Sequence, residues 1–557
     1  MATLRAAKCH FRFDNGDSVA AQLLDIFGFL SVLLRGGVLA LNTLVLGGIV
    51  FTFWVLRGPS RHRENEIVWH PCRRLLCFSA SALAVVQFCW VATDTSILSS
   101  TTDLGLREIS GATFFVAGMA GCAAACTIAA ATFARTRRPR AFLWAPALIS
   151  LGAVAATSHG AGRLDHRIGL IFLTVLHQAS TAVWLGGLPY LAVSLARFPA
   201  AAPLICRRFS PLALCSVSIL AASGLAMSRA YIGSGAAIYG TAYGAMVASK
   251  VVLLLFLLLL GGFNYLIVRG RTERLFALLA HLRRFAEAEI GIGFTVILAA
   301  ASLTSQPPAV DLVQGRVSAA EIRQRMHPVW PRLQTPPLAA LTPATPFRFG
   351  AAAGPTSFTP GTSYQPSSPA DIAWSEYNHH WAGLIVLGAG LLASLACVPA
   401  ARWARHWPLV FLALAVFLFL RSDPENWPLG PRSFWQSFAV AEVMQHRLFT
   451  LLVVIFAIFE WGVRNGRIAS LHATLVFPAV CAVGGALLLT HTHSLANVKE
   501  ELLAELSHLP LAILAVIAGW SRWLELRLPR AQQRIPSCIW PVCFILIGAV
   551  LLNYREG

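Results

Sequence analysis

Uninterrupted apolar runs recur along the whole chain, and many reach the length of about 18 residues that spans a hydrocarbon core about 30 Å thick. The runs are continuous and do not alternate between polar and apolar residues, which excludes a transmembrane barrel. Charged residues make up only 12% of the 557 residues, about half the share in soluble domains. The sequence therefore predicts an all-α, polytopic transmembrane helical bundle.

We expect fourteen membrane spans, eight before and six after a region rich in proline. Their predicted positions are 28–56, 75–98, 109–134, 141–158, 167–196, 209–230, 243–268, 285–304, 379–400, 408–421, 440–463, 469–490, 502–524 and 536–553.

Arginine placement predicts the orientation of these spans. The formal net charge of +19 resembles that of a nucleic-acid binder. However, the connecting loops alternate between a set holding 25 Lys or Arg and a set holding 8. Basic loops face the cytoplasm, so the excess charge is a topology signal, and no nucleic-acid partner is expected. We predict a multi-pass protein of a bacterial inner membrane with both termini on the periplasmic side.

The composition divides the chain into four parts. Residues 1–27 are predicted to form an N-terminal outer segment, without the pattern of a cleaved signal peptide. Residues 28–304 form an eight-helix membrane domain. Residues 305–377, rich in Pro, Ser and Thr, are expected to form a mostly extended periplasmic linker. Residues 378–557 form a six-helix membrane domain.

One apolar run carries a histidine at membrane depth. In LHQASTAVWLGGLPYL, residues 176–191, His177 lies about ten residues inside its span, which is roughly 15 Å at 1.5 Å per residue. An ionisable group at that depth is costly unless satisfied, so it indicates a functional position. Neutral imidazole suits copper, iron and zinc alike, which leaves the ion open. The alternative is a hydrogen bond from His177 to a serine or a backbone carbonyl in the bundle.

Further candidate ligands lie toward the outer surface. His159 and His166, in TSHGAGRLDHR, belong to the hairpin before this span and are expected to lie above His177 on one route from outside. Met227 is at the outer end of its own span, and its thioether favours Cu(I). We therefore predict metal-binding roles for His159, His166, His177 and Met227.

The same stretch resembles a known family. HQASTAVWLGGL is similar to the H-x6-W-L-G-G-L signature of the copper resistance protein D family of bacterial inner-membrane proteins. The resemblance continues in RRFSPLALCSVSILAASGLAMSRAYIG (207–233), YGAMVASKVVLLLFLLLLGGFNYLIVRG (243–270) and EAEIGIGFTVILAAASLTSQPP (287–308). It implies copper handling, with transfer of copper between the periplasm and the cytoplasm or a membrane copper enzyme. The residues at matching positions are His177, Trp184, Gly186, Gly187, Lys250 and Asn264.

Several of these residues also have a structural interpretation. Gly186 and Gly187 are expected to permit close helix packing, and Trp184 to pack or to shield His177. Lys250 is expected to repel cations, to pair with an acid or to snorkel outward. Glu289 has no evident partner in the sequence, and proton balance and helix packing both remain open for it.

A second group of histidines lies in the C-terminal half. HTHSLANVKEELLAELSH (491–508) places His491 and His493 at an outer helix end, and Glu505 and His508 at the i, i+3 spacing that offers two ligands to one ion. His379, His380 and His446 start spans from the same side by the predicted topology. The set predicts an outer metal site for zinc, copper or iron, with ordinary interfacial histidines as the alternative.

The leading functional hypothesis is a copper-handling inner-membrane protein that binds copper on the periplasmic side and transports or delivers it through the bundle. Its expected partners are the copper ion, the lipid bilayer and a periplasmic copper chaperone or membrane copper enzyme. A redox protein with b-type haem and an accessory or assembly subunit of a membrane enzyme are the alternatives. No nucleotide loop, nucleophile elbow or H-E-x-x-H motif predicts an enzyme.

Overall fold

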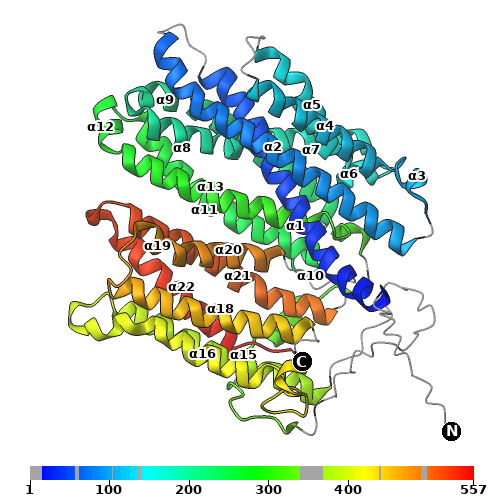
Figure 1. Cartoon of the computed structure of the whole chain (residues 1–557), viewed down its shortest axis with the longest axis vertical. Helices are drawn as coiled ribbons and strands as arrows, with labels where there is room; N and C mark the ends of the chain where they lie inside the picture. The colour runs from blue at the N-terminus through cyan, green and yellow to red at the C-terminus, as the bar shows by residue number, and fades with distance from the viewer. Residues whose placement is uncertain are drawn as a thin grey trace, which may run out of the picture.

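The computed structural model describes residues 16–56, 62–102, 104–134, 140–312, 314–338, 341, 368–437, 441–490 and 499–556. These residues are mostly helical and contain no β-strand, so the predicted all-α class is confirmed. In Figure 1 the helices of the N-terminal half lie above those of the C-terminal half.

The N-terminal half contains the following elements, with η marking 3₁₀- and π-helical segments: α1 (Gly16–Val50), η1 (Phe51–Val55), α2 (His62–Thr101), α3 (Leu106–Ile109), α4 (Thr113–Phe133), η2 (Arg140–Leu143), α5 (Trp144–Ala156), α6 (His159–Gly162), α7 (Arg167–Thr181), η3 (Ala182–Gly186), α8 (Leu188–Arg197), η4 (Pro199–Ala201), α9 (Ala202–Ile232), α10 (Gly235–Gly240), α11 (Ala242–Arg269), α12 (Thr272–Ala277) and α13 (Leu279–Leu303).

The connecting region and the C-terminal half contain η5 (Ala309–Asp311), α14 (Ala319–Met326), α15 (Pro369–Leu395), η7 (Pro399–Leu409), α16 (Val410–Arg421), α17 (Phe434–Ser437), α18 (Ala441–Arg464), α19 (Leu471–Thr474), α20 (Val476–Thr490), α21 (Lys499–Arg527), η8 (Arg530–Gln532) and α22 (Arg534–Leu552).

Twelve helical segments in the described residues are long and apolar enough to cross a membrane, and each coincides with a predicted span. The other two predicted spans are also helical. Span 141–158 contains the short apolar helix α5, and span 379–400 lies largely in the 27-residue helix α15, which has a polar start. A polytopic helical bundle is therefore confirmed, whereas the count of fourteen crossings stays a prediction.

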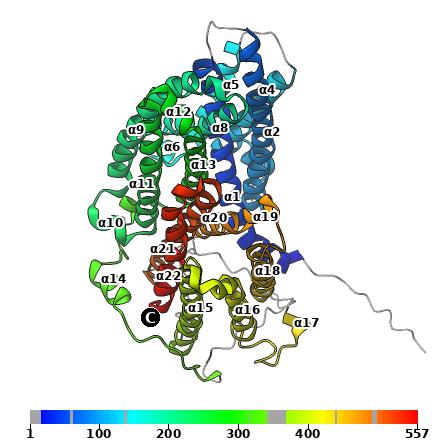
Figure 2. The ribbon, with the colours of Figure 1, turned by 90° about the vertical axis from the view of Figure 1, so that its left-hand side faces the viewer.

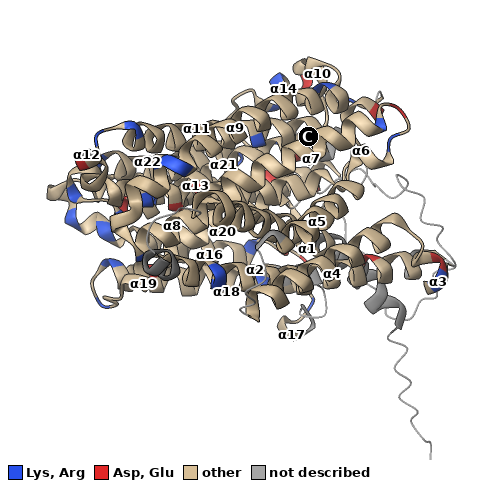
Figure 3. Cartoon of the chain, turned by 90° about the horizontal axis from the view of Figure 1, so that it is seen from above, with Lys and Arg blue, Asp and Glu red and all other residues tan. Residues whose placement is uncertain are grey.

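The two ends of the bundle differ in charge. Lys and Arg gather at the end that carries α12 (Figure 3), and α3, α6, α10 and the C-terminus lie at the other end (Figure 1). Between the ends, large apolar side chains such as Phe88, Leu255 and Leu452 are exposed on the outside of the bundle, where lipid would cover them. Which end faces the periplasm stays a prediction.

A close crossing of α1 and η3 fixes the segment that follows His177. A Cβ atom on Gly186 would overlap the carbonyl oxygen of Thr43, and one on Gly47 would overlap the backbone of Gly186. Gly187 lies against the ring of Phe209, where a Cβ atom would come within 2.6 Å of a ring carbon. These glycines therefore allow the backbones to approach closely, which is the packing role expected for Gly186 and Gly187.

Within the region between the halves, the described residues 305–312, 314–338 and 368–377 are less extended than predicted. The backbone N–H of Val317 donates to the carbonyl of Gly240 in α10, and α14 begins with a capping box formed by Ser318 and Glu321. Helix α15 begins at Pro369, before the predicted boundary at residue 378. A good N-cap and local apolar contacts fold these parts despite their composition.

Helix α13 connects the two halves, because it contacts α20 and α21 (Figure 2). A Cβ atom on Gly291 would overlap the indole of Trp520 in α21. One turn away, the carboxylate of Glu287 accepts a hydrogen bond from Trp523 Nε1 at 3.1 Å and lies 3.7 Å from the guanidinium of Arg527. The C-terminal half thus packs on one side of the helix that carries Glu289.

Candidate functional site

His177 lies in α7 and faces α9, where its Nδ1 atom is 3.1 Å from Oγ of Ser223. Oγ of Ser223 is also 2.7 Å from the carbonyl oxygen of Ile219 and 3.1 Å from that of Leu220, to which the hydroxyl donates. The carbonyl oxygen of Leu220 also lies close enough to the His177 ring to accept a hydrogen bond from it. The structural alternative predicted for His177, a bond to a serine, is therefore present.

This bonding pattern selects one tautomer of His177. Because the single hydroxyl proton of Ser223 is donated to a backbone carbonyl, its oxygen accepts a hydrogen bond from Nδ1–H of the imidazole. In the neutral ring, the lone pair then resides on Nε2. A hydrogen bond at one ring nitrogen that leaves the other free to bind is the arrangement seen in metal-ligating histidines.

Lys250 of α11 lies close enough to act electrostatically on the His177 ring. Within the described residues, no acidic group pairs with Lys250, so of the three interpretations predicted for it, pairing with an acid is not realised. A positive charge at this position opposes the binding of a cation at His177.

His159 lies at the start of α6, at the end of the bundle opposite α12. Its Nε2 atom donates to the carbonyl of Leu303 at 2.7 Å. Its ring meets those of Tyr231 and Tyr243 edge-on, at centroid distances of 6.2 and 6.1 Å. The bond at Nε2 leaves Nδ1 of the neutral ring with the lone pair. His159 is thus held at the junction of α6, α9, α11 and α13.

A polar cavity of about 520 Å³ opens beside His159. Its lining includes Ser158, Asp165 and the ion pair between Arg163 and Asp311, whose N and O atoms are 3.0 Å apart. His166 is exposed, caps the start of α7 in the left-handed conformation with φ 53°, and is not part of the cavity lining. The cavity therefore contains His159 but not His166.

One face of α9 runs from the rings of His159 and Tyr231 past His177 to a second cavity inside the bundle. Tyr231 meets the ring of His159, Ser223 and Leu220 lie against His177, and Val217, Ala213 and Ser210 line this inner cavity. These residues, with Met227 between Tyr231 and Ser223, follow one another at intervals of three or four positions. Such spacing places them on a single helix face. Met227 is partly buried, one turn outward from Ser223.

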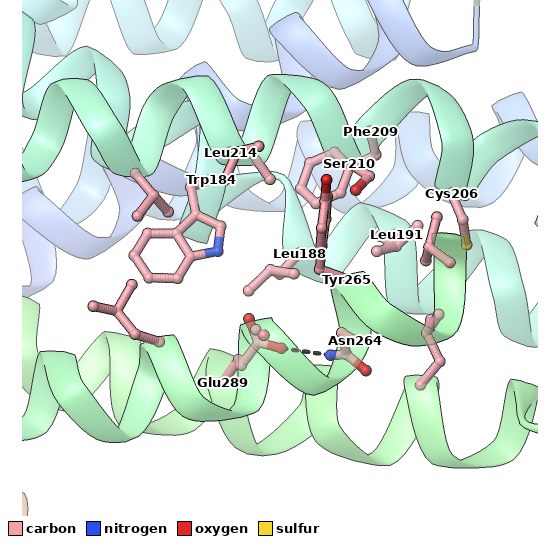
Figure 4. Close-up of a pocket in the computed structure, with 17 residues that line it drawn as sticks. Trp184, Leu188, Leu191, Cys206, Phe209, Ser210, Leu214, Asn264, Tyr265 and Glu289 are labelled. Atoms are coloured by element: carbon pink, nitrogen blue, oxygen red, sulfur yellow. Dashed lines mark hydrogen bonds between the residues drawn. The ribbon is translucent and has the colours of Figure 1, made fainter. Parts of the chain in front are cut away.

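The inner cavity has a volume of about 210 Å³ and lies between η3, α8, α9, α11 and α13 (Figure 4). Glu289, of which 1% is exposed, is the acidic residue in its lining. One carboxylate oxygen accepts from Nδ2 of Asn264 at 2.5 Å, and the side chain of Trp184 lies close to this carboxylate. Trp184 therefore lies by Glu289, whereas the sequence analysis expected it to pack or to shield His177.

The sequence contained a signal for the pairing of Asn264 with Glu289. The predicted spans 243–268 and 285–304 are consecutive and antiparallel, and Asn264 and Glu289 each stand four residues from the inner end of their span. Polar residues at equal depth on neighbouring helices are expected to meet, because lipid offers them no partner.

The C-terminal half brings three aromatic rings together near the C-terminus. The ring of His379 stacks on Tyr554 with centroids 3.9 Å apart, and His508 meets His379 edge-on at 6.1 Å. Burial raises the pKa of the Tyr554 hydroxyl above its ordinary value, so this phenol stays neutral. Glu505, buried one turn before His508 on α21, is 4% exposed.

The other histidines of this half have separate positions. His380 accepts a hydrogen bond from the backbone N–H of Arg332 and donates to the carbonyl of Tyr554. His446 lies 2.8 Å from a carboxylate oxygen of Asp423. His491 and His493 lie outside the described residues. In the part of the chain that the structure describes, no group of three or more His, Cys, Asp or Glu side chains is arranged to hold a metal ion.

Residues 203–303 match the family model of copper resistance protein D. The resemblance to this family is confirmed over that segment. The copper transport protein CutJ of Bacillus subtilis (strain 168) is 33% identical to the chain over 160 residues, which is 28% of this chain and 28% of the relative. No solved structure matches the chain. The comparisons support a copper-related membrane protein.

The matched segment contains α9, α11 and α13, and so it includes both Ser223, the partner of His177, and the pair of Asn264 and Glu289. The family resemblance and the buried polar groups therefore coincide in space.

Proposed function

We propose that this chain takes up copper at its outer surface and moves it inward through the N-terminal helices. The observation that carries the proposal is the bond between His177 Nδ1 and Ser223, which leaves Nε2 of a deeply placed imidazole as a metal-binding nitrogen. In the inner membrane of a bacterium, the outer surface would be the periplasmic one. We infer transport or delivery, without an enzymatic reaction.

The route begins at the polar cavity beside His159 and continues along α9. His159 would receive the ion, Met227 would offer a thioether one turn outward from Ser223, and His177 would bind the ion at membrane depth. Imidazole and thioether ligands suit copper, and a thioether favours Cu(I) over zinc. On this route the ion would meet His159, Met227 and His177 one after another. Ligands that are spaced along a path favour passage of the ion over permanent storage.

His166, exposed outside the cavity, would act only as an outer collecting ligand. In the C-terminal half, His379 and His508 would form a second outer binding site with Glu505 and with His491 and His493, which would deliver copper to the N-terminal half. The approach of His379 to His508 supports this part of the proposal.

Copper uptake by proteoliposomes containing the full chain tests the main proposal. His177→Ala is expected to reduce Cu(I) uptake at least tenfold, and His281→Ala, a change in a histidine that bonds Gln532 at the other end of the bundle, serves as the control. Unchanged uptake in His177→Ala, with correct folding shown by size-exclusion chromatography, would falsify the role of His177.

A chaperone or a membrane copper enzyme as partner is tested separately. Co-purification of the gently solubilised chain is expected to retain copper and such a partner. A purified chain that carries haem, seen as a Soret band, would contradict the copper proposal and favour the redox alternative.

A further inference from the structure

Glu289 is a buried carboxyl group that the proposed copper route does not use. Its side chain is 1% exposed and it lies on α13 within a membrane-spanning segment. Its hydrogen-bond partner, the amide of Asn264, and the nearby side chain of Trp184 are both neutral groups. Among the described residues no Lys or Arg forms an ion pair with it. A full negative charge is thus only partly compensated at this position.

The surroundings leave space next to this carboxyl. The inner cavity of about 210 Å³ borders Glu289, and Oε2 would lie 3.4 Å from a Cβ atom on Gly261, so glycine keeps this side open. Oδ1 of Asn264 is buried and has no hydrogen-bond partner. Figure 4 shows Asn264 and Glu289 side by side at the cavity wall, with Trp184 across from them. Two oxygen-bearing side chains from different helices therefore border one space.

Few other titratable groups face this space. Cys206 of α9 and Tyr265 of α11 are part of the cavity lining, whereas η3 and α8 contribute Trp184, Leu188 and Leu191. On α13 itself, Glu287 pairs with Arg283, Arg284 and Arg527 on the side of the C-terminal half. Glu289 is therefore the acidic group of the cavity.

A carboxylate in a low-dielectric site needs a compensating cation, and a proton is the smallest one. We propose that Glu289 is a proton-exchange site: its carboxyl carries a proton while the cavity holds no other cation, and releases that proton when a monovalent cation enters. The exchange is –COOH + M⁺ → –COO⁻···M⁺ + H⁺, so charge is conserved and no oxidant or reductant is required.

This inference depends on the proposed function only for the identity of the cation, which would be Cu(I). Because the cavity and His177 both lie along the same face of α9, an ion leaving His177 inward meets Glu289 next. Entry of one Cu(I) beside Glu289 would then release one proton, and departure of the ion would require the carboxylate to take up one proton again. The site would thus hold no uncompensated charge before, during or after passage of the ion.

Infrared difference spectroscopy of the purified full chain tests the proton on Glu289 without any copper. The metal-free protein is expected to show a protonated-carboxyl C=O band at neutral pH that Glu289→Gln lacks. Glu273→Gln, which changes an exposed acid of α12, keeps the band. A wild-type spectrum identical to that of Glu289→Gln overturns the proposal.

Addition of Cu(I) under reducing conditions gives the second measurement. The wild-type chain and Glu273→Gln are expected to lose the band and to release one more proton per copper than Glu289→Gln, as a pH-sensitive dye records. Equal proton release by all three overturns the exchange. A wild-type chain that shows the band but binds no Cu(I) contradicts the proposed copper function and leaves Glu289 as a proton site for another monovalent cation, which Na⁺ addition then tests by the same band.

Discussion

Nδ1 of His177 and Oγ of Ser223 lie 3.1 Å apart and join α7 to α9 by a hydrogen bond in which the imidazole is the donor. Ser223→Ala removes the acceptor that fixes the tautomer and ring orientation of His177. Loss of such a supporting bond lowers metal affinity roughly 10- to 100-fold. We expect Cu(I) affinity, measured by competition with a chromogenic chelator, to fall within this range.

Ser218→Ala is the matched control for that measurement, because Ser218 is exposed on the same helix and its hydroxyl bonds only to the carbonyl of Leu214. Copper affinity equal to wild type in both variants would show that Ser223 does not support a metal ligand.

Lys250 is expected to weaken cation binding at His177 through its positive charge. Removing a like charge in a partly buried site changes binding by about 1.4 kcal/mol or more, which is a factor of about ten. Lys250→Leu, which adds no metal ligand, should therefore bind Cu(I) about tenfold more tightly, whereas Lys250→Arg, which keeps the charge, should resemble wild type. If the Leu and Arg variants bind equally well, Lys250 has no electrostatic influence on the site.

The crossing of α1 and η3 is expected to tolerate no side chain at Gly186. A Cβ atom there would overlap the carbonyl oxygen of Thr43, and overpacking of this kind costs about 1–3 kcal/mol. Gly186→Ala should lower the thermal unfolding midpoint in detergent. Gly152→Ala in α5 has nothing within 4 Å of the new atom and should leave the midpoint unchanged or slightly raised. Equal midpoints for the two variants would contradict the close crossing.

The outer cluster of the C-terminal half is tested by metal content. His379→Ala and His508→Ala each remove one of two imidazoles whose centroids are 6.1 Å apart, and each is expected to lower the copper bound per chain by about one ion. His472→Ala, a change in an exposed histidine on α19, is the control. Elemental analysis that gives the same copper content for all three variants would leave this cluster as aromatic packing.

The membrane fold could be predicted from the sequence because lipid imposes simple rules on it. Apolar length predicts a spanning helix and arginine placement predicts its direction, so the positions of the spans agree with the helices observed. A helix boundary differs from the predicted one where a capping box determines the start of the helix. Pro369 starts α15 ten residues before the predicted span at 379, because Ser368 and Asp371 form a capping box.

The candidate site could be predicted only in part, since side-chain pairing depends on how helices rotate against each other. His177 stood out by its depth, but its partner Ser223 is one of several serines on its helix. Trp184 was expected near His177 from a spacing of seven residues. The π-helical segment η3 adds a residue to the turn and thereby changes the direction of the indole, which instead lies near Glu289.

The overlap that any side chain at Gly291 would make with Trp520 has a practical consequence for work on this protein. The matched family segment ends on α13, so a natural choice for a minimal unit is a fragment of the first 304 residues. Such a fragment would present to detergent the groove that normally receives an indole, and Glu287 would lose Trp523 and Arg527 as partners. Glu289, two residues away on the same helix, would then be measured in a different setting, so its chemistry is best studied in the intact chain.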